Sequence, residues 1–373
     1  MITNYNASCW RIYGLWVTVL TCTFTFLVPI YAQRNSGSAP TIFRHSSDVS
    51  SVEFLPDGKH ILSGYGTEED RGGLLLWNTT SSGSPESSLI NGKTVNQLLS
   101  VAKDGNLLCL TENASGVNVI QVVSTSRPKE FHPIPNVNGI NFQCIAMSPD
   151  GKTLLAGGGD FQSNQPAVIM QWSRSGNTYS RSRLLGKYLY AATIFSVAYS
   201  PDGKLIAGVG NDYDAGVSEL KIWNAKTNNV QANIINGKEG LVSKLIFSPN
   251  YNLLAVVGDS IGLRDSHGKL LHLLHIKNHA NSAIFSPDGK YLIVGERSSQ
   301  QKGLIKVWET KTFRLISTVV AHQGAINDLA FSPNGLLLAS ASADKTVKIW
   351  NFQQIILTNS SKNDSAKSSL RKL

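Results

Sequence analysis

Residues 321–352 read AHQGAINDLAFSPNGLLLASASADKTVKIWNF, and this stretch decides the fold. Three apolar runs, at 326–331, 336–341 and 347–350, are separated by two polar turns. In the first turn Pro333 presets one backbone dihedral, and Gly335 takes a left-handed conformation at little steric cost. The last run is β-branched and aromatic, as strands prefer. The segment is therefore predicted to form a three-stranded antiparallel meander.

The first turn of this segment recurs, and its copies divide the chain into seven units. The copies are at 55–58, 102–105, 148–151, 200–203, 248–251, 286–289 and 332–335. They lie roughly 40 to 50 residues apart, a period typical of stacked repeats. The third apolar run of five units ends at a tryptophan, namely Trp77, Trp172, Trp223, Trp308 and Trp350. Val119–Ile120 and Leu263 are predicted to take this place in units two and five.

These repeats resemble the WD-repeat family of β-propellers over roughly residues 41 to 352. The resemblance rests on the Ser-Pro-Asp-Gly turns, on the strand ending Lys221-Ile222-Trp223-Asn224, and on the Ala321-His322 pair that opens the last unit. It implies an all-β, seven-bladed β-propeller made of four-stranded antiparallel blades. It also implies a non-catalytic scaffold for protein–protein interaction. We identify the chain as an exported or membrane-anchored member of bacterial type.

The amino-terminal segment is the reason for predicting export. Residues 12–32 carry no charge, follow Arg11, and contain Pro29 and Ala32 ahead of a possible cleavage site. Residues 1–32 are therefore predicted to be a cleaved signal peptide or an uncleaved membrane anchor, unless the true start lies further along the chain. Either form places the ring outside the cytoplasmic membrane, as a periplasmic or a secreted protein.

The remaining domain boundaries follow from composition. Residues 33–40 are predicted to be a linker, residues 41–357 the propeller, and residues 358–373 a disordered tail. One strand must come from a chain end to complete the last blade, and the candidates are 41–44 and 354–357. We favour the amino-terminal strand, which would leave a closed, monomeric ring.

Composition limits the classes of partner. The net charge is +9, but no Lys/Arg cluster with interleaved aromatic residues appears, so nucleic-acid binding is not expected. Cys109 and Cys144 lie in apolar runs and are read as buried free thiols, with a disulfide as the alternative. The histidines of unit five, at 267, 272, 275 and 279, do not have the spacing of metal ligands. No metal and no cofactor are predicted.

Four residues of the last unit suggest a catalytic set but are read as structural. In the WD-repeat family, residues at the places of His322, Ser342, Asp344 and Trp350 form a hydrogen-bonded network that ties a turn to the strands beneath it. A serine nucleophile would also need an elbow such as Gly-x-Ser-x-Gly, which the sequence lacks.

The loops between second and third strands carry the binding hypothesis. Such loops emerge on one face of a propeller, where a rigid scaffold positions them. Three of them are predicted to form an acidic rim for a basic protein or peptide, or else for a divalent cation, through Glu68, Glu69, Asp70, Asp160, Asp212 and Asp214. The alternative is an exported propeller hydrolase of a lactone, glycan or peptide, with acid–base residues in the central funnel.

Overall fold

The computed structural model describes residues 39–357 apart from short internal segments. These are 68–71, 82–83, 92, 102–105, 113–116, 125–130, 135–139, 160–166, 177, 189–192, 213, 251–252 and 299. The predicted export segment, most of the linker and the predicted carboxy-terminal tail lie outside the described residues. Within the described part of the chain, no helix combines the length and the apolar character needed to cross a bilayer.

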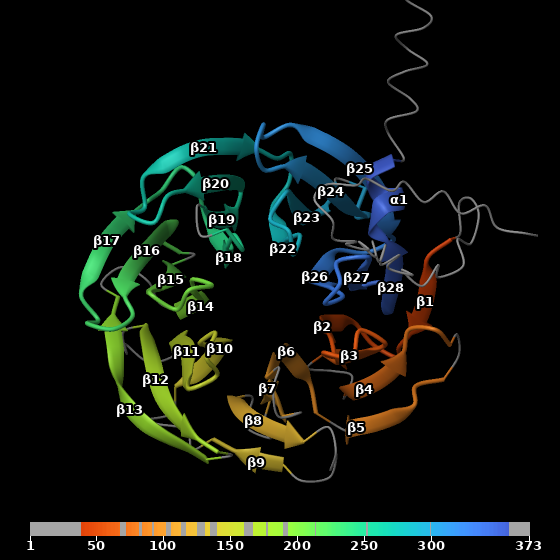
Figure 1. Cartoon of the computed structure of the whole chain (residues 1–373), viewed down its shortest axis with the longest axis horizontal. Coiled ribbons are helices and arrows are strands. Elements are labelled where there is room, and N and C mark those ends of the chain that lie inside the picture. The colour runs from red at the N-terminus through yellow and green to blue at the C-terminus, as the bar shows by residue number, and fades with distance from the viewer. Residues whose placement is uncertain are drawn as a thin grey trace, which may run out of the picture. The chain divides into compact units, whose positions relative to one another are not determined.

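Seven four-stranded antiparallel sheets surround a central axis as the blades of a propeller (Figure 1). Blade one contains β2 (Val49–Phe54), β3 (His60–Tyr65), β4 (Gly73–Asn78) and β5 (Ser87–Asn91). Blade two contains β6 (Val95–Val101), β7 (Asn106–Glu112), β8 (Asn118–Ser124) and β9 (Phe131–Pro133). Blade three contains β10 (Asn141–Met147), β11 (Thr153–Gly159), β12 (Val168–Ser175) and β13 (Thr178–Lys187). The predicted architecture of seven four-stranded blades is confirmed.

The later blades repeat the same order from the axis outward. Blade four contains β14 (Thr193–Tyr199), β15 (Leu205–Asp212), β16 (Val217–Asn224) and β17 (Val230–Ile235). Blade five contains β18 (Val242–Phe247), β19 (Leu254–Gly258), β20 (Ser260–Arg264) and β21 (Leu270–His275). Blade six contains β22 (Ala280–Phe285), β23 (Tyr291–Arg297), β24 (Gly303–Glu309) and β25 (Leu315–His322). Blade seven contains β26 (Ile326–Phe331), β27 (Leu337–Ser342) and β28 (Thr346–Asn351).

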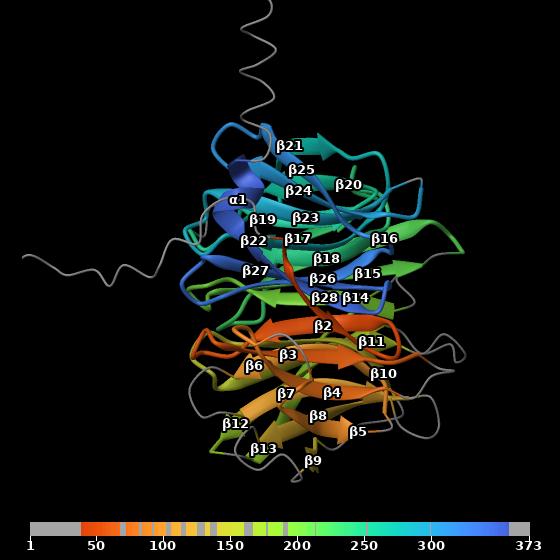
Figure 2. The same ribbon diagram turned by 90° about the vertical axis from the view of Figure 1, so that its right-hand side faces the viewer.

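The amino-terminal strand completes blade seven. β1 (Thr41–Arg44) pairs antiparallel with β28, from Thr41 opposite Ile349 to Arg44 opposite Thr346. Blades one and seven are thus neighbours in the ring, with β2 beside β26, β27 and β28 (Figure 2). The prediction that the amino-terminal strand closes the ring is confirmed.

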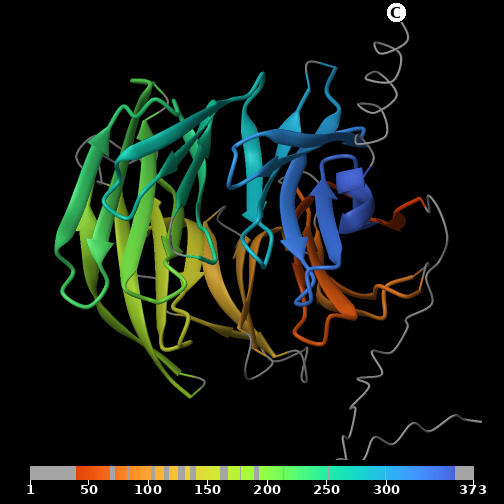
Figure 3. The same cartoon turned by 45° about the horizontal axis from the view of Figure 1, so that its top comes forward.

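The competing segment forms a helix instead. α1 (Phe352–Leu357) buries Phe352 and Ile355, which are three residues apart and so share one helix face. Ser317 of β25 donates a hydrogen bond from its hydroxyl to the carbonyl oxygen of Ile355, at 2.6 Å. α1 thus packs against β25 of blade six and β28 of blade seven, near the blue end of the colour range (Figure 3).

Each inner strand carries a β-bulge at the same place. The register shifts between Val49 and Ser51 in blade one, between Ile326 and Asp328 in blade seven, and at the equivalent step of the other five blades. The extra residue of one blade can reach the next blade: Ser243 donates to the carbonyl oxygen of Ala280 at 2.6 Å, and Asn327 donates to that of Val49 at 2.9 Å. The bulges therefore help to join neighbouring blades around the channel.

The register also corrects two positions of the repeat. In blade seven Trp350 of the third strand lies opposite Leu338 of the second strand. Residues of the other blades that lie at the same distance from the bulge along the paired strands are equivalent to Trp350, and we call this position the tryptophan place. Val123 takes the tryptophan place in blade two, and Arg264 takes it in blade five. The sequence assignment to Val119–Ile120 and Leu263 is therefore wrong, because without a tryptophan the end of the third strand has no marker. Cys109 and Cys144 are buried free thiols, as expected.

Candidate functional site

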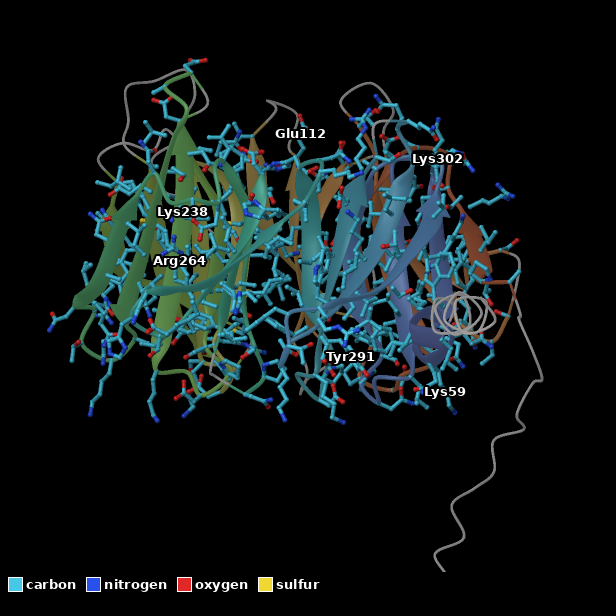
Figure 4. All side chains as sticks on the ribbon, turned by 90° about the horizontal axis from the view of Figure 1, so that it is seen from above. Lys59, Glu112, Lys238, Arg264, Tyr291 and Lys302 are labelled. Atoms are coloured by element: carbon cyan, nitrogen blue, oxygen red, sulfur yellow. The ribbon has the colours of Figure 1, made fainter. Side chains whose placement is uncertain are left out.

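The two faces of the ring carry different connections. Glu112 ends a second strand and Lys302 precedes a third strand, and both lie at one face, while Lys59 and Tyr291 lie at the opposite face (Figure 4). We name the face with Glu112 and Lys302 the loop face. The loops between second and third strands and the links into the inner strands meet there. His279 of such a link lies 2.9 Å from Asp259 of such a loop. We name the other the turn face, after its Pro-Asp-Gly turns.

Two of the six predicted rim carboxylates can be placed, and both belong to one loop of the loop face. Asp212 ends β15, and its Oδ1 accepts hydrogen bonds from the backbone N–H groups of Asp214 and Ala215, at 3.0 Å each. This contact fixes the turn. The side chain of Asp214 is exposed. Glu68, Glu69, Asp70 and Asp160 lie outside the described residues.

The predicted network of the last unit is built around a different serine. His322 Nδ1 lies 2.9 Å from an Asp344 carboxylate oxygen, and its Nε2 lies 2.7 Å from Ser340 Oγ. Trp350 Nε1 donates to the same Ser340 Oγ at 2.9 Å. Because the carboxylate only accepts, Nδ1 carries the proton and Nε2 accepts from the serine. Ser342, named from the sequence, instead accepts the backbone N–H of Asp344 at 3.0 Å.

The electrostatics of this network suit a structural role. Burial lowers the pKa of His322, so the imidazole is neutral at pH 7. Burial opposes ionisation of Asp344, but hydrogen bonds from His322 and Thr346 hold the pKa of that carboxyl well below its usual range. Ser340 is 0 % exposed, so its hydroxyl cannot meet a substrate.

A second network of the same kind lies in blade one, and sequence analysis missed it. His45 Nε2 lies 2.7 Å from Ser63 Oγ, and Trp77 Nε1 donates to that oxygen at 2.7 Å. Burial lowers the pKa of His45 to about 4. A sequence signal was present, since His45 comes directly after the fourth strand β1 and His322 is the last residue of the fourth strand β25. The network of blade one lies at the seam between blades seven and one, whereas that of His322 links blade six to blade seven.

Blade five replaces the network with a buried ion pair. Arg264, at the tryptophan place, donates from Nε and from one terminal nitrogen to the two carboxylate oxygens of Glu239, at 2.7 and 2.8 Å. The other terminal nitrogen donates to the carbonyl oxygen of Gly268 at 2.7 Å. Arg264 is 5 % exposed and Glu239 is 1 % exposed. A Cβ at Gly262 would come within 1.8 Å of Glu239 Oε1, so the pair needs a glycine there.

The central channel contains a cavity of about 400 Å³, lined by the inner strands of all seven blades. Most of the polar lining is uncharged: serine, asparagine and glutamine side chains. Among the described residues that line it, the charged ones are Glu53, Lys244 and Asp328, from blades one, five and seven. None of these three was singled out from the sequence.

Asp328 is fully engaged within this channel. Its Oδ1 lies 3.2 Å from Lys244 Nζ, so the ion pair bridges blades five and seven. Its Oδ2 accepts from Ser51 Oγ at 3.0 Å and from the backbone N–H of Val52 at 3.2 Å. Because Ser51 and Val52 belong to blade one, Asp328 also joins the first and last blades at the seam.

Glu53 has a different setting. Burial, followed by the charge of Asp328, raises the pKa of Glu53 to about 8, and Lys244 offsets part of that rise. A sequence signal for this residue existed. Aligned on the turns, the inner strands read Val52-Glu53-Phe54 in blade one and Leu329-Ala330-Phe331 in blade seven, so the carboxyl replaces a small apolar residue.

Comparison with known sequences agrees with this geometry. The family model described as "WD domain, G-beta repeat" matches residues 38–78 and 313–351. These two segments hold both histidine–serine–tryptophan networks. The blades in which other residues replace the network, such as blade five, lie outside the matched segments.

Longer proteins contain similar sequences. The chain is 29 % identical over 227 residues to "Periodic tryptophan protein 2 homolog" of Dictyostelium discoideum. The aligned region covers 58 % of this chain and 22 % of that protein. The chain is 24 % identical over 337 residues to "WD repeat-containing protein 26 homolog" of Arabidopsis thaliana, covering 88 % and 53 %. It is 34 % identical over 140 residues to "Transcriptional corepressor LEUNIG_HOMOLOG" of Arabidopsis thaliana, covering 36 % and 17 %.

The chain thus spans about half the length of one of these relatives and less than a quarter of the other two. All three come from eukaryotes, so these similarities do not support a bacterial type. Two neighbouring blades of the chain match the WD repeat, and the described part of the chain folds as a seven-bladed β-propeller.

Proposed function

We propose that this ring is a non-catalytic scaffold that binds a protein or peptide partner on its loop face. The observation that carries the proposal is the contrast between buried and exposed polar groups. The histidine–serine–tryptophan networks and the Arg264–Glu239 pair are buried between strands, where they hold the blades together. The exposed carboxylate of Asp214 instead projects from a turn fixed by Asp212. A loop held in this way on a rigid ring suits recognition.

The channel does not favour the alternative of a hydrolase. An enzyme of that kind needs an acid and a base that are free to exchange protons with a substrate. Glu53 and Asp328 do line one cavity, but Lys244, Ser51 and the backbone of Val52 occupy both oxygens of Asp328. The described lining contains no histidine.

Location and assembly remain proposals as well. Export rests on residues 12–32 alone, and we propose that the ring acts outside the cytoplasmic membrane on that basis. The closed ring supports a monomer, because β1 pairs with the strand of blade seven that would otherwise be its open edge.

The rim hypothesis predicts that the partner associates more slowly when the negative charge of the rim carboxylates is removed. A pull-down with the ring, followed by mass spectrometry, identifies the partner whose binding is then measured. Replacing Asp212 and Asp214 with Asn should lower the association rate by about three- to tenfold at low salt, with little change in dissociation. Asn also forms the turn that Asp212 makes, so the loop geometry is kept. Stopped-flow or biosensor kinetics at several salt concentrations give both rates.

Asp202→Asn with Asp288→Asn is the matched control on the turn face. Each of these carboxylates accepts from a serine hydroxyl and from a backbone N–H. Asn334 makes the same contacts in blade seven, so asparagine is tolerated in this turn. Equal slowing by both pairs of substitutions, or binding that does not depend on salt, would contradict the rim hypothesis.

A further inference from the structure

The position of Glu53 in the ring is unusual. The register places it opposite Leu62, two residues after Ser51. The equivalent positions of the other blades hold leucine, isoleucine or alanine, namely Leu99, Ala146, Ala198, Ile246, Ile284 and Ala330. An apolar residue is thus compatible with this position of the fold. A carboxyl group at the channel wall is costly there, which suggests a use for it.

The charges in the channel do not balance. Lys244 is already bound to Asp328 at 3.2 Å, and Asp328 receives further hydrogen bonds from blade one. Ionised Glu53 would therefore leave one negative charge in excess among the charged groups of the described lining. A single positive charge brought in by a ligand would restore neutrality.

The cavity decides which cation fits. Its volume of about 400 Å³ is large enough for a chain of several carbon atoms with its terminal group, and apolar side chains such as Met147 and Phe195 line part of it. An alkyl chain can lie along such a wall while its charged end reaches a carboxylate. The serine, asparagine and glutamine side chains of the lining supply further acceptors for an ammonium group.

We propose that the central channel binds an alkylammonium group and that Glu53 is its acceptor. The group can belong to a free diamine or to the lysine side chain of a partner, and the chemistry is the same in both cases. The proposal does not depend on the acidic rim, because the rim loop and Glu53 belong to different parts of the ring.

Binding should be linked to a proton. The pKa of Glu53 lies at about 8, so without ligand most of this carboxyl is protonated at pH 7. The groups that face it are Asp328 of β26 and Lys244 of β18. Cys144 also lines the channel, and burial raises the pKa of its thiol to about 12, so the thiol stays protonated. An alkylammonium keeps its own proton up to about pH 10. Bringing it to Glu53 therefore expels the proton of Glu53.

The test uses 1,5-diaminopentane as the probe and the full chain as the protein. Calorimetric titrations at pH 6.5 and 8.5 should show about 25-fold tighter binding at the higher pH, because the ionised fraction of a group of pKa 8 changes by that factor. Titrations at pH 7 in buffers of different ionisation enthalpy should show that nearly one proton is released. Absence of binding at millimolar diamine would overturn the proposal, as would an affinity that does not change with pH.

Two substitutions in the channel should act in opposite directions. Glu53→Gln removes the acceptor charge, and we expect at least tenfold weaker binding without proton release. Lys244→Met removes the competing cation, and we expect tighter binding. Glu86→Gln changes the same kind of charge elsewhere in blade one and should leave binding unchanged. Thermal unfolding of each variant checks that the ring is intact. Undiminished binding to a folded Glu53→Gln protein would place the amine elsewhere.

A second arm separates the two sources of the ammonium group. A short peptide with one internal lysine is compared with the same peptide carrying norleucine, which keeps the alkyl chain and lacks the charge. Glu53-dependent binding of the lysine peptide that is tighter than that of the diamine identifies a partner side chain as the ligand. Tighter binding of the diamine identifies a free amine. Equal binding of both peptides, together with no binding of the diamine, overturns the proposal. The loss of the rim effect with diamine binding intact would affect the proposed function alone.

Discussion

A chain that begins at Val49 is expected to lose the cooperative unfolding of the ring, whereas a chain that begins at Ala39 keeps it. The shorter chain lacks β1 and therefore the outer partner of β28. It also lacks Phe43, which is buried against Trp77 with ring centroids 5.0 Å apart. Burial of one such side chain contributes about 1.5–3 kcal/mol. The deletion removes His45 as well, and with it the network that contains Ser63.

The seam between blades seven and one makes this deletion severe. In the other blades the fourth strand follows the first three along the chain, but in blade seven the fourth strand is β1, which comes from the amino-terminal part of the chain. Blade one is therefore joined to the rest of blade seven only through the pairing of β1 with β28 and through side-chain contacts. Tryptophan fluorescence and calorimetry during thermal unfolding measure the cooperativity. A chain that ends at Thr358 retains α1 and is expected to unfold like the full chain. If the chain beginning at Val49 melts as sharply as the one beginning at Ala39, strand pairing by β1 does not hold the ring closed.

Glu239→Gln is expected to lower the free energy of unfolding by about 3–5 kcal/mol, because it leaves the Arg264 guanidinium buried without a counter-ion. Arg264 is 5 % exposed and cannot reach water without moving β20. Replacing both residues, as Glu239→Leu with Arg264→Met, removes both charges and should recover most of the loss. Urea titration of the single and double variants measures the coupling between the two sites.

Gly262→Ala provides an independent test of the same pair. A methyl group there would lie within 1.8 Å of Glu239 Oε1, so it should disrupt the pair without removing either charge. The substitution should be strongly destabilising in the wild type and less so in the double variant, in which no ion pair remains to be broken. Additive losses for all combinations would mean that the pair contributes nothing beyond its separate side chains.

Much of the fold could be predicted from local chemistry. The Pro-Asp-Gly turns fix where first strands end, and tryptophans mark where five third strands end. Together these gave the number of blades and the need for a closing strand. Blades two and five were placed less well, because Val123 and Arg264 stand where other blades have tryptophan. An arginine at the tryptophan place could not be recognised from the sequence. Its partner Glu239 lies 25 residues earlier, and only the structure shows the ion pair between them.

The candidate site was harder to predict, for two physical reasons. Ser340 and Ser342 are two residues apart on one strand, so they point to the same side, and sequence spacing cannot choose between them. The register decides, since Ser340 lies opposite Lys348 and within reach of both His322 and Trp350. The channel charges come from β2, β18 and β26, which only ring closure brings together. Glu53 could nevertheless have been noticed as the polar exception in an aligned set of inner strands.

Lysine labelling in the presence of the captured partner tests the proposed binding face most directly. Exposed lysines mark the loop face at Lys238, Lys277 and Lys345, and the turn face at Lys59, Lys152, Lys204 and Lys290. An amine-reactive reagent followed by mass spectrometry compares each lysine with and without partner. We expect the partner to protect lysines of the loop face and to leave those of the turn face as reactive as before. Protection of the four turn-face lysines, with the loop face unchanged, would contradict the proposed mode of binding.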